Sequence, residues 1–179
     1  GMQTWLALPD RKEEIDPAFE THADLPLIED GRASARVIMG ELWDEKAPTT
    51  THAETIYAEI NLAPGGTIPV DSEADERAVM LVDGAAKADG VELERYRLYV
   101  LAPGRDIALA SATGAKIMLL GGEAFDSERH VWWNFVSSSR ERIEQAKRDW
   151  REGRFPKVPG DAEEFIPLPE GAPKTVTYP

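Results

Sequence analysis

Two carboxylates and a guanidinium stand out in the middle of this sequence, because their spacing could bring them together. Asp71 and Glu73 are two residues apart, and Arg77 follows four residues later. Residues two apart on a strand point to the same face of a sheet, so the two carboxylates would lie side by side. Such a pair can bind a hard cation weakly. Arg77 would place a permanent positive charge where that cation has to sit.

The glycines around this segment give it a spacing that resembles the first motif of cupin barrels. That motif reads G-x5-H-x-H-x3-E-x6-G, and its two histidines and glutamate face the barrel interior as metal ligands. Gly65 and Gly84 match the glycines, and the three ligand slots hold Asp71, Glu73 and Arg77. Divalent iron, manganese and nickel favour neutral imidazoles together with a carboxylate. We therefore expect no metal here, and an ordinary ion pair in a loop or at the barrel mouth instead.

The second cupin motif leads to the same expectation. Its core, P-x-G-x2-H-x3-N, aligns best with residues 102–104 as its first three positions. Ile107 then occupies the histidine slot and Ser111 the asparagine slot. The side chain of Ile107 has no atom that can bind a metal ion. No ligand slot in either motif offers an imidazole.

The other residues that could carry chemistry form no recognisable site. His22, His52 and His130 lie in separate zones of the sequence, so a metal site assembled from them by folding is not favoured. The serine run at residues 137–139 is typical of a helix start, since no motif supplies a base that would activate a nucleophile. The chain has no cysteine, which excludes disulfides and thiolate ligands. We expect no catalytic residue.

A series of short strands is expected to position these slots. In residues 56–62 apolar and polar side chains alternate, which is the period of a strand with one buried face. Further strands are expected at residues 77–82, 85–91 as the hairpin partner of 77–82, 98–101, 107–111 and 115–120. Strands this short, separated by glycine and proline, predict a closed barrel, with another all-β sandwich as the alternative.

One helix and a proline-rich tail are expected after the strands. Ser138 precedes Glu141 by three residues, the capping-box spacing of a helix start, and Gly153 suits a helix end. These signals predict a helix over about residues 138–152. Repeated prolines then disfavour regular structure, so residues 153–179 should form an extended arm. Such an arm either wraps its own domain or crosses to a partner.

Length and charge narrow the classes of function. With 179 residues, the chain is expected to form one domain, residues 1–179, with its core strands between about residues 33 and 120. Its net charge of −13 repels phosphate backbones and anionic lipids, so neither nucleic acid nor a membrane is an expected partner. No apolar run approaches the roughly 20 residues of a membrane span. No secretion signal is visible either, and we expect a cytoplasmic protein.

Both ends of the sequence resemble the pirin family. The stretch HVWWNFVSSSRERIEQAKRDW at residues 130–150 is similar to the C-terminal part of pirins, as are GRF at 153–155 and PGDAEEFIPLP at 159–169. The stretch QTWLALP at residues 3–9 looks like the phrase at which a pirin passes from its first cupin half to its second. The resemblance therefore covers nearly the whole chain.

This resemblance implies the second half of a two-barrel protein. Pirins carry iron ligands, three histidines and a glutamate, in their N-terminal half, whereas the C-terminal half has typically lost them. The implied fold is all-β, a cupin-type (jelly-roll) β-barrel with one C-terminal α-helix and an extended tail. Iron is then expected only in an N-terminal half, and this chain should hold no cofactor. The family's activities, quercetin dioxygenation and transcriptional co-regulation, depend on the iron-bearing half.

The leading hypothesis is a non-catalytic cupin module that packs against another barrel. The expected partner is a second copy, giving a homodimer, or an N-terminal cupin half. Trp132, Trp133, Phe135 and Trp150 are the candidate contact residues, because aromatic side chains anchor interfaces. The alternative is that these aromatics pack in the domain's own core. Two other hypotheses stay open: an iron-dependent, quercetin 2,3-dioxygenase-like enzyme with an unconventional ligand set, and a barrel that binds a small molecule without chemistry.

Overall fold

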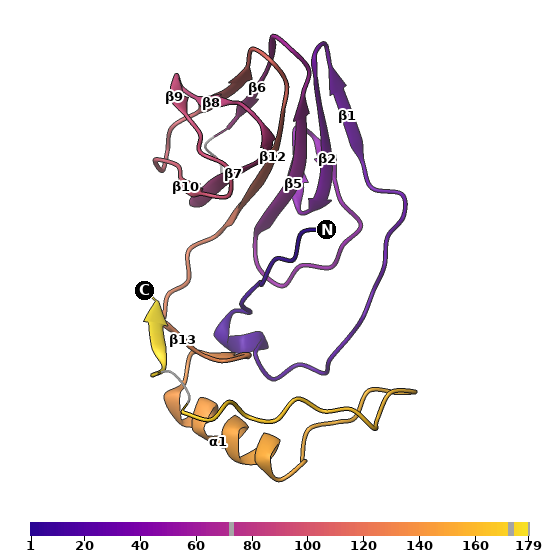
Figure 1. Ribbon diagram of the computed structural model, residues 1–179, viewed down its shortest axis with the longest axis vertical. Helices are drawn as coiled ribbons and strands as arrows, with labels where there is room; N and C mark the ends of the chain where they lie inside the picture. Colours follow the sequence, from indigo (N-terminus) through magenta and orange to yellow (C-terminus); the bar gives the residue numbers. More distant parts are fainter. Residues whose placement is uncertain (72–73, 172–173, 179) are drawn as a thin grey trace. The chain divides into compact units, whose positions relative to one another are not determined.

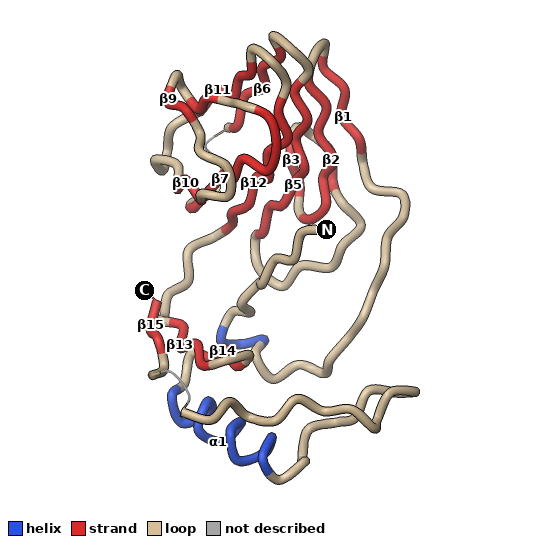
Figure 2. Tube along the Cα trace, in the orientation of Figure 1, coloured by secondary structure: helices blue, strands red, loops and turns tan. Residues whose placement is uncertain are grey.

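The structure, a computed structural model, describes residues 1–71, 74–171 and 174–178 and consists of two compact units (Figure 1). The barrel unit comprises Asp16–Ala124. The terminal unit combines Gly1–Ile15 with Phe125–Pro179. Strands dominate the barrel unit, while the α-helix lies in the terminal unit (Figure 2). The two ends of the sequence therefore belong to the same unit.

Two antiparallel sheets build the barrel unit, one with strand order β1-β2-β5-β12-β7-β10 and one with strand order β6-β11-β8-β9. The strands of the larger sheet are β1 (Leu27–Asp30), β2 (Ala33–Met39), β5 (Thr55–Leu62), β12 (Ala115–Gly122), β7 (Glu76–Gly84) and β10 (Leu98–Val100). Those of the smaller sheet are β6 (Gly66–Val70), β11 (Ile107–Ser111), β8 (Lys87–Ala88) and β9 (Val91–Glu92). A short hairpin pairs β3 (Glu41–Leu42) with β4 (Glu45–Lys46).

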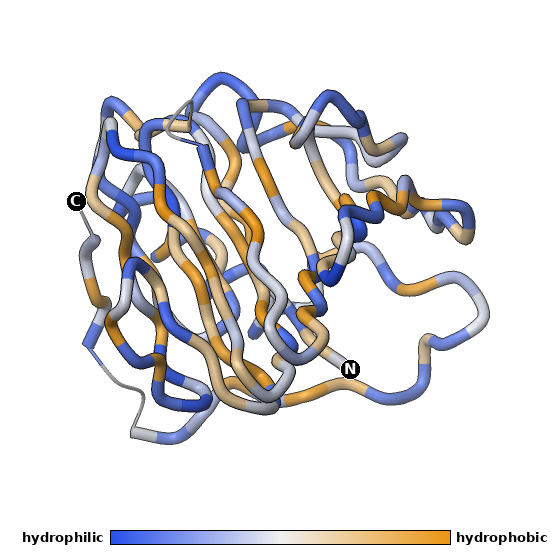
Figure 3. Tube along the Cα trace, turned by 90° about the horizontal axis from the view of Figure 1, so that it is seen from above, coloured by the Kyte–Doolittle hydropathy of each residue, from blue (hydrophilic) through white to orange (hydrophobic). Residues whose placement is uncertain are grey.

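Alternation along the strands gives the barrel unit its core. In β5 each apolar residue from Ile56 to Leu62 is buried and each residue between them is only half-buried, which confirms the predicted strand. Side chains from both sheets meet in one hydrophobic cluster, and the hydrophobic residues follow the strands in Figure 3. The largest fully buried side chains of this unit are Val37, Ile60, Val70, Val79, Leu81, Leu109, Ile117 and Leu119. An interior filled with aliphatic side chains is the main source of stability of such a barrel.

Glycine allows β7 and β12 to pair along their whole length. Gly84 has a φ of 78°, in the left-handed region, and a Cβ there would overlap the carbonyl oxygen of Gly114. At the other end of the pair, a Cβ on Gly121 would overlap the carbonyl oxygen of Glu76. The resulting register places Gly121 opposite Arg77.

Two of the predicted strands differ from those observed. The prediction that residues 85–91 pair with 77–82 is wrong, because β7 pairs with β12 and β10, while β8 pairs with β11 and β9. The prediction of a core strand at residues 98–101 is also wrong, because β10 is an edge strand in which Val100 is 78% exposed. The first error arises because a short apolar run beside a turn fits a local hairpin as well as it fits a distant partner. The second arises because an apolar run does not tell an edge strand from a central one.

The terminal unit holds a three-stranded sheet and α1 (Arg140–Arg151), the one α-helix of the described residues. Its strand order is β14-β13-β15, formed by β13 (Arg129–Trp132), β14 (Phe135–Ser137) and β15 (Val176–Tyr178), and a short 3-10 helix, η1, spans Asp10–Lys12. This single α-helix agrees with the predicted fold class. Neither helix within the described ranges is long and apolar enough to cross a bilayer.

The start of α1 is shifted by one residue from the predicted cap. Ser139, rather than Ser138, is the N-cap, because its hydroxyl accepts a hydrogen bond from the backbone N–H of Arg142 at 3.2 Å. The backbone N–H of Ser138 instead donates to the carboxylate of Glu13 at 2.7 Å. The helix start is therefore fixed to the N-terminal segment of the same unit.

Removal of a buried side chain should show how much the barrel depends on its core. Leu109→Ala would leave a cavity where the side chain is fully buried, and we expect the free energy of unfolding to fall by about 2–5 kcal/mol. Urea denaturation monitored by circular dichroism measures this change. Val91→Ala is the control, because Val91 is an exposed strand residue. Equal effects of the two substitutions would contradict the observed core.

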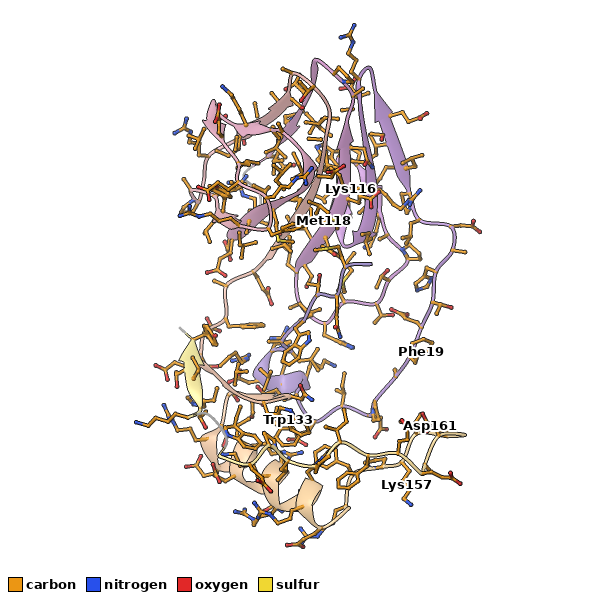
Figure 4. All side chains as sticks on the ribbon, in the orientation of Figure 1. Phe19, Lys116, Met118, Trp133, Lys157 and Asp161 are labelled. Carbon is orange, nitrogen blue, oxygen red and sulfur yellow. The ribbon has the colours of Figure 1, made fainter. Side chains whose placement is uncertain are left out.

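The pair formed by Glu59 and Lys116 should make stability depend on acid pH. Hydrogen bonds from Asn61 and Lys116, each 3.0 Å long, lower the pKa of the Glu59 carboxyl from 4.5 (Lys116 is labelled in Figure 4). A lowered pKa contributes stability above the unfolded-state pKa, and this contribution is lost as the pH falls through the folded-state pKa. Glu59→Gln should cost up to about 1 kcal/mol at neutral pH and less at about pH 3, which is below the ordinary pKa of 4.5. Urea denaturation at both pH values tests this, and a pH-independent difference would contradict it.

Candidate functional site

The third ligand slot of the first cupin motif points into the barrel. Arg77 lies near the start of β7, and it alternates with Val79 and Leu81, which both belong to the hydrophobic core. Residues with this spacing share a face of the strand. Arg77 is only 2% exposed. A guanidinium, permanently charged in proteins, is therefore buried beside an aliphatic interior.

Backbone carbonyls hold the buried guanidinium of Arg77. Its Nη2 donates to the carbonyl oxygens of Ala102 at 2.9 Å and Arg105 at 2.7 Å. Its Nη1 donates to the carbonyl oxygens of Val70, at 3.4 Å, and Asp71. The Nε atom has no hydrogen-bond partner among the described residues. Arg77 thus joins the end of β6 and the loop between β10 and β11 to β7.

The two slots of the second motif offer little to a metal ion. Ile107 is buried and lies opposite Val70 in the pairing of β11 with β6, so an aliphatic side chain fills the histidine slot of the second motif. Asp71 follows β6 directly, and Glu73 lies outside the described residues. Ser111 has a structural role, because its hydroxyl donates to the carbonyl oxygen of Ala85 at 2.5 Å.

The described slot residues do not fit a catalytic iron. Within residues 1–71, 74–171 and 174–178, no group of three or more histidine, aspartate or glutamate side chains could hold a metal ion. His22 and His52 belong to the barrel unit, whereas His130 belongs to the terminal unit, where its Nδ1 lies 3.0 Å from the hydroxyl of Thr177. Arg77 brings a fixed cation to the third slot. No reaction step through a metal follows from these residues.

The short hairpin of β3 and β4 forms an acidic pocket beside Asp71, which sequence reasoning missed. Its volume is about 240 Å³, and its lining residues are Glu41, Leu42, Trp43, Asp44, Glu54, Ile56, Asp71 and Ala74. Trp43 and Asp44 both have positive φ, as a two-residue hairpin turn requires. The Trp43 indole donates to the carbonyl oxygen of Pro69 at 2.9 Å and so ties the hairpin to β6.

The four predicted interface aromatics lie together in the terminal unit. Trp133 contacts Phe135 and Trp150 with ring centres 5.6 and 5.4 Å apart, and Trp132 stacks on Phe135 at 5.9 Å (Trp133 is labelled in Figure 4). Phe155, from the tail, stacks on Phe135 at 5.6 Å. These contacts occupy much of the aromatic surface inside the unit itself. A role for the four residues in an interface stays a prediction.

Arg129 ties the N-terminal segment to the sheet of the terminal unit, and sequence reasoning did not single it out. It is buried, pairs with Asp10 at 2.8 Å, and lies 3.6 Å from the carboxylate of Glu13. Its guanidinium also lies 4.0 Å from the centre of the Phe125 ring. A hydrogen bond from Ser127, followed by the charge of Arg129, lowers the pKa of the Asp10 carboxyl. The pair is therefore ionised at neutral pH.

Comparison with known proteins identifies the family. The family described as "Pirin C-terminal cupin domain" matches residues 57–156, which is more than half of the chain. The chain belongs to the pirin family. A pirin-like protein from Caulobacter vibrioides is 43% identical over 173 residues, which cover 95% of this chain and 60% of that protein. A pirin-like protein from Solanum lycopersicum is 25% identical over 165 residues, which cover 86% of this chain and 56% of that protein.

Solved structures confirm the cupin jelly-roll fold expected of a pirin. The crystal structure of a quercetin 2,3-dioxygenase from Acinetobacter baumannii superposes with a TM-score of 0.84 and 28% sequence identity. The match covers 92% of this chain and 56% of that chain. This member of the pirin family therefore spans between half and two thirds of the length of these relatives.

Loss of the Arg77 guanidinium should destabilise the barrel unit strongly. Arg77→Met keeps an apolar stem of similar length but removes the donors to four backbone carbonyls, so we expect the free energy of unfolding to fall by about 3–5 kcal/mol. Thermal and urea denaturation measure this loss. Arg97→Met is the matched control, because Arg97 pairs with Glu94 at an exposed position and should change stability by less than about 0.5 kcal/mol. Comparable effects would show that the carbonyl network is unimportant.

Proposed function

We propose that this chain is a pirin-type cupin module that holds no metal of its own and acts by binding a second cupin barrel. The observation that carries the first part of this proposal, the lack of a metal, is the burial of Arg77 in the third ligand slot, where four carbonyl oxygens bind its guanidinium. A divalent cation beside this guanidinium would meet like-charge repulsion at short range. Ile107 supports the absence of a metal as well, since a buried aliphatic side chain fills the histidine slot of the second motif.

The greater length of the relatives supports a role in binding for this chain. The relatives contain further polypeptide beyond the part that matches this chain, since the matched part is 60% of the Caulobacter protein and 56% of the Acinetobacter chain. A second barrel is therefore the natural partner, provided either by an N-terminal cupin half or by another copy. The net charge of −13 opposes association with nucleic acid and anionic membranes.

A second candidate function is iron-dependent oxygenation of a flavonol. The observation that favours it is the likeness to the quercetin 2,3-dioxygenase of Acinetobacter baumannii, with a TM-score of 0.84. This function needs iron bound by residues outside the usual slots, together with turnover of quercetin. A third candidate, binding of a small molecule, has less support in the barrel unit, because aliphatic side chains fill the barrel interior.

Metal content separates the first two candidates. The purified chain is incubated anaerobically with ferrous iron, desalted and subjected to elemental analysis. We expect less than about 0.1 iron per chain, because the slots offer no imidazole. The Acinetobacter quercetin 2,3-dioxygenase, treated in the same way, is the control for loading. Near-stoichiometric iron that survives desalting, together with turnover of quercetin, would replace the proposed function by the dioxygenase.

A further inference from the structure

A pocket of about 390 Å³ lies in the terminal unit, beside the C-terminal end of α1. Trp150 and Arg151 of α1 form one part of its wall, and residues between positions 153 and 165 of the tail form the rest. We call it the tail pocket. Cavities of roughly 300–1,000 Å³ are typical of sites for small organic molecules. The tail pocket contains none of the ligand slots of the cupin motifs.

Hydrogen bonds hold the tail in place around the tail pocket. The indole N–H of Trp150 donates to the carbonyl oxygen of Ile166 at 2.8 Å, which brings the far end of the tail back to α1. Between these points the tail turns at Gly160, which has a φ of 80°, and the backbone N–H of Asp161 donates to the carbonyl oxygen of Val158 at 3.1 Å. The chain's own contacts therefore shape the pocket, and a preformed pocket binds at a lower entropic cost.

Three aromatic rings line the tail pocket. The ring of Trp150 lies 5.3 Å from that of Phe155 and 6.3 Å from that of Phe165, measured between ring centres. The planes of these two pairs are inclined by 67° and 40°, so the rings do not stack as parallel plates. Phe165 is 68% exposed, and Trp150 is the one ring that it contacts within the described residues. The face of an aromatic ring carries partial negative charge, so open rings attract a cation.

Carboxylates on the tail add negative charge to the same pocket. Asp161, Glu163 and Glu164 line it, and none of their side chains forms an ion pair or a hydrogen bond within the described part of the chain (Asp161 is labelled in Figure 4). Arg151 and Lys157 line it as well, so three carboxylates and two cations leave one net negative charge. The net charge of −13 of the whole chain further favours a cation. Rings and carboxylates thus select the same sign of ligand.

We propose that the tail pocket binds a small quaternary ammonium compound, with its methylated head on the three rings and its positive charge close to the carboxylates. A quaternary ammonium group has no N–H that needs an acceptor, so it can leave water for an aromatic surface. The ammonium of Lys147 lies 4.4 Å from the centre of the Trp132 ring, so a contact of this kind already occurs in the terminal unit. This inference goes beyond the proposed function and is independent of it.

A metal ion suits the tail pocket less well than an organic cation. A hard cation needs several oxygen ligands close together. Among the described residues, no group of three or more histidine, aspartate or glutamate side chains could hold a metal ion. The carboxylates of the pocket therefore act as a diffuse negative charge, which matches a cation whose charge is spread over methyl groups.

Titration with choline tests the proposal. The signal of the Trp150 indole N–H is followed by heteronuclear NMR at constant ionic strength, and its absence from Trp150→Phe assigns it. We expect a saturable shift with a dissociation constant in the millimolar range or tighter. The uncharged analogue of choline, in which a tert-butyl group replaces the trimethylammonium head, has the same shape and should bind at least about fivefold more weakly.

Two further variants test the rings and the carboxylates separately. Phe165→Ala removes an exposed ring, so the chain should still fold, and choline binding should weaken by at least about threefold. Phe19→Ala is the matched control, because Phe19 is 91% exposed in the barrel unit (labelled in Figure 4), and it should leave binding unchanged. The double variant Glu163→Gln and Glu164→Gln should weaken choline binding by at least about twofold at low salt, without affecting the uncharged analogue.

Four outcomes would overturn the inference. A shift that does not saturate at about 10 mM choline would show that the pocket has no ammonium site. Equal affinity for the uncharged analogue would show that the pocket selects for shape and not for charge. Equal binding by the wild type and Phe165→Ala would place choline outside the tail pocket. Sedimentation with phosphatidylcholine vesicles, without binding of free choline, would replace the free compound by a lipid headgroup. None of these results changes the iron content or the binding of a second barrel, so the proposed function is tested by its own experiment.

Discussion

A buried guanidinium needs acceptors for its N–H groups, and the barrel unit is built to supply them to Arg77. The end of β6 and the loop between β10 and β11 turn their carbonyl oxygens towards this one side chain. Carbonyl oxygens attract a cation, and here the cation is part of the chain. The same oxygens do not suit an anion at this position. A glutamate at position 77 would bring its carboxylate against the same oxygens and be repelled by them.

In the terminal unit, many of the packing contacts are made between aromatic rings. Aromatic rings from β13, β14, α1 and the tail contact one another, so the residues that look most like interface anchors in the sequence are largely used inside the unit. The strand register instead places Val136, Val176 and Tyr178 on the other face of the sheet, where they are exposed. For this sheet, strand register is therefore a better guide to the open surface than aromatic content is.

The features that sequence could predict are local ones. Alternation in β5 and β11, the turn glycine Gly84 and the approximate bounds of α1 follow from neighbours a few residues apart. The spacing of the ligand slots likewise identified Arg77 and Ile107. Sequence gave no signal for the acceptors of Arg77, because they are backbone carbonyls up to 28 residues away. The same holds for Arg129, whose partner carbonyl at Leu8 is 121 residues distant. It also holds for β15, which pairs with β13 although α1 and the tail separate the two strands in the sequence.

The terminal unit joins the first fifteen residues of this sequence to its last fifty-five, and this has a consequence for biosynthesis. The barrel unit contains all of its strands between β1 and β12, so it can fold while the ribosome is still adding the rest. The sheet of the terminal unit is complete only after β15 has been made, at residues 176–178. The terminal unit can therefore form its complete sheet only after the barrel unit has been synthesised.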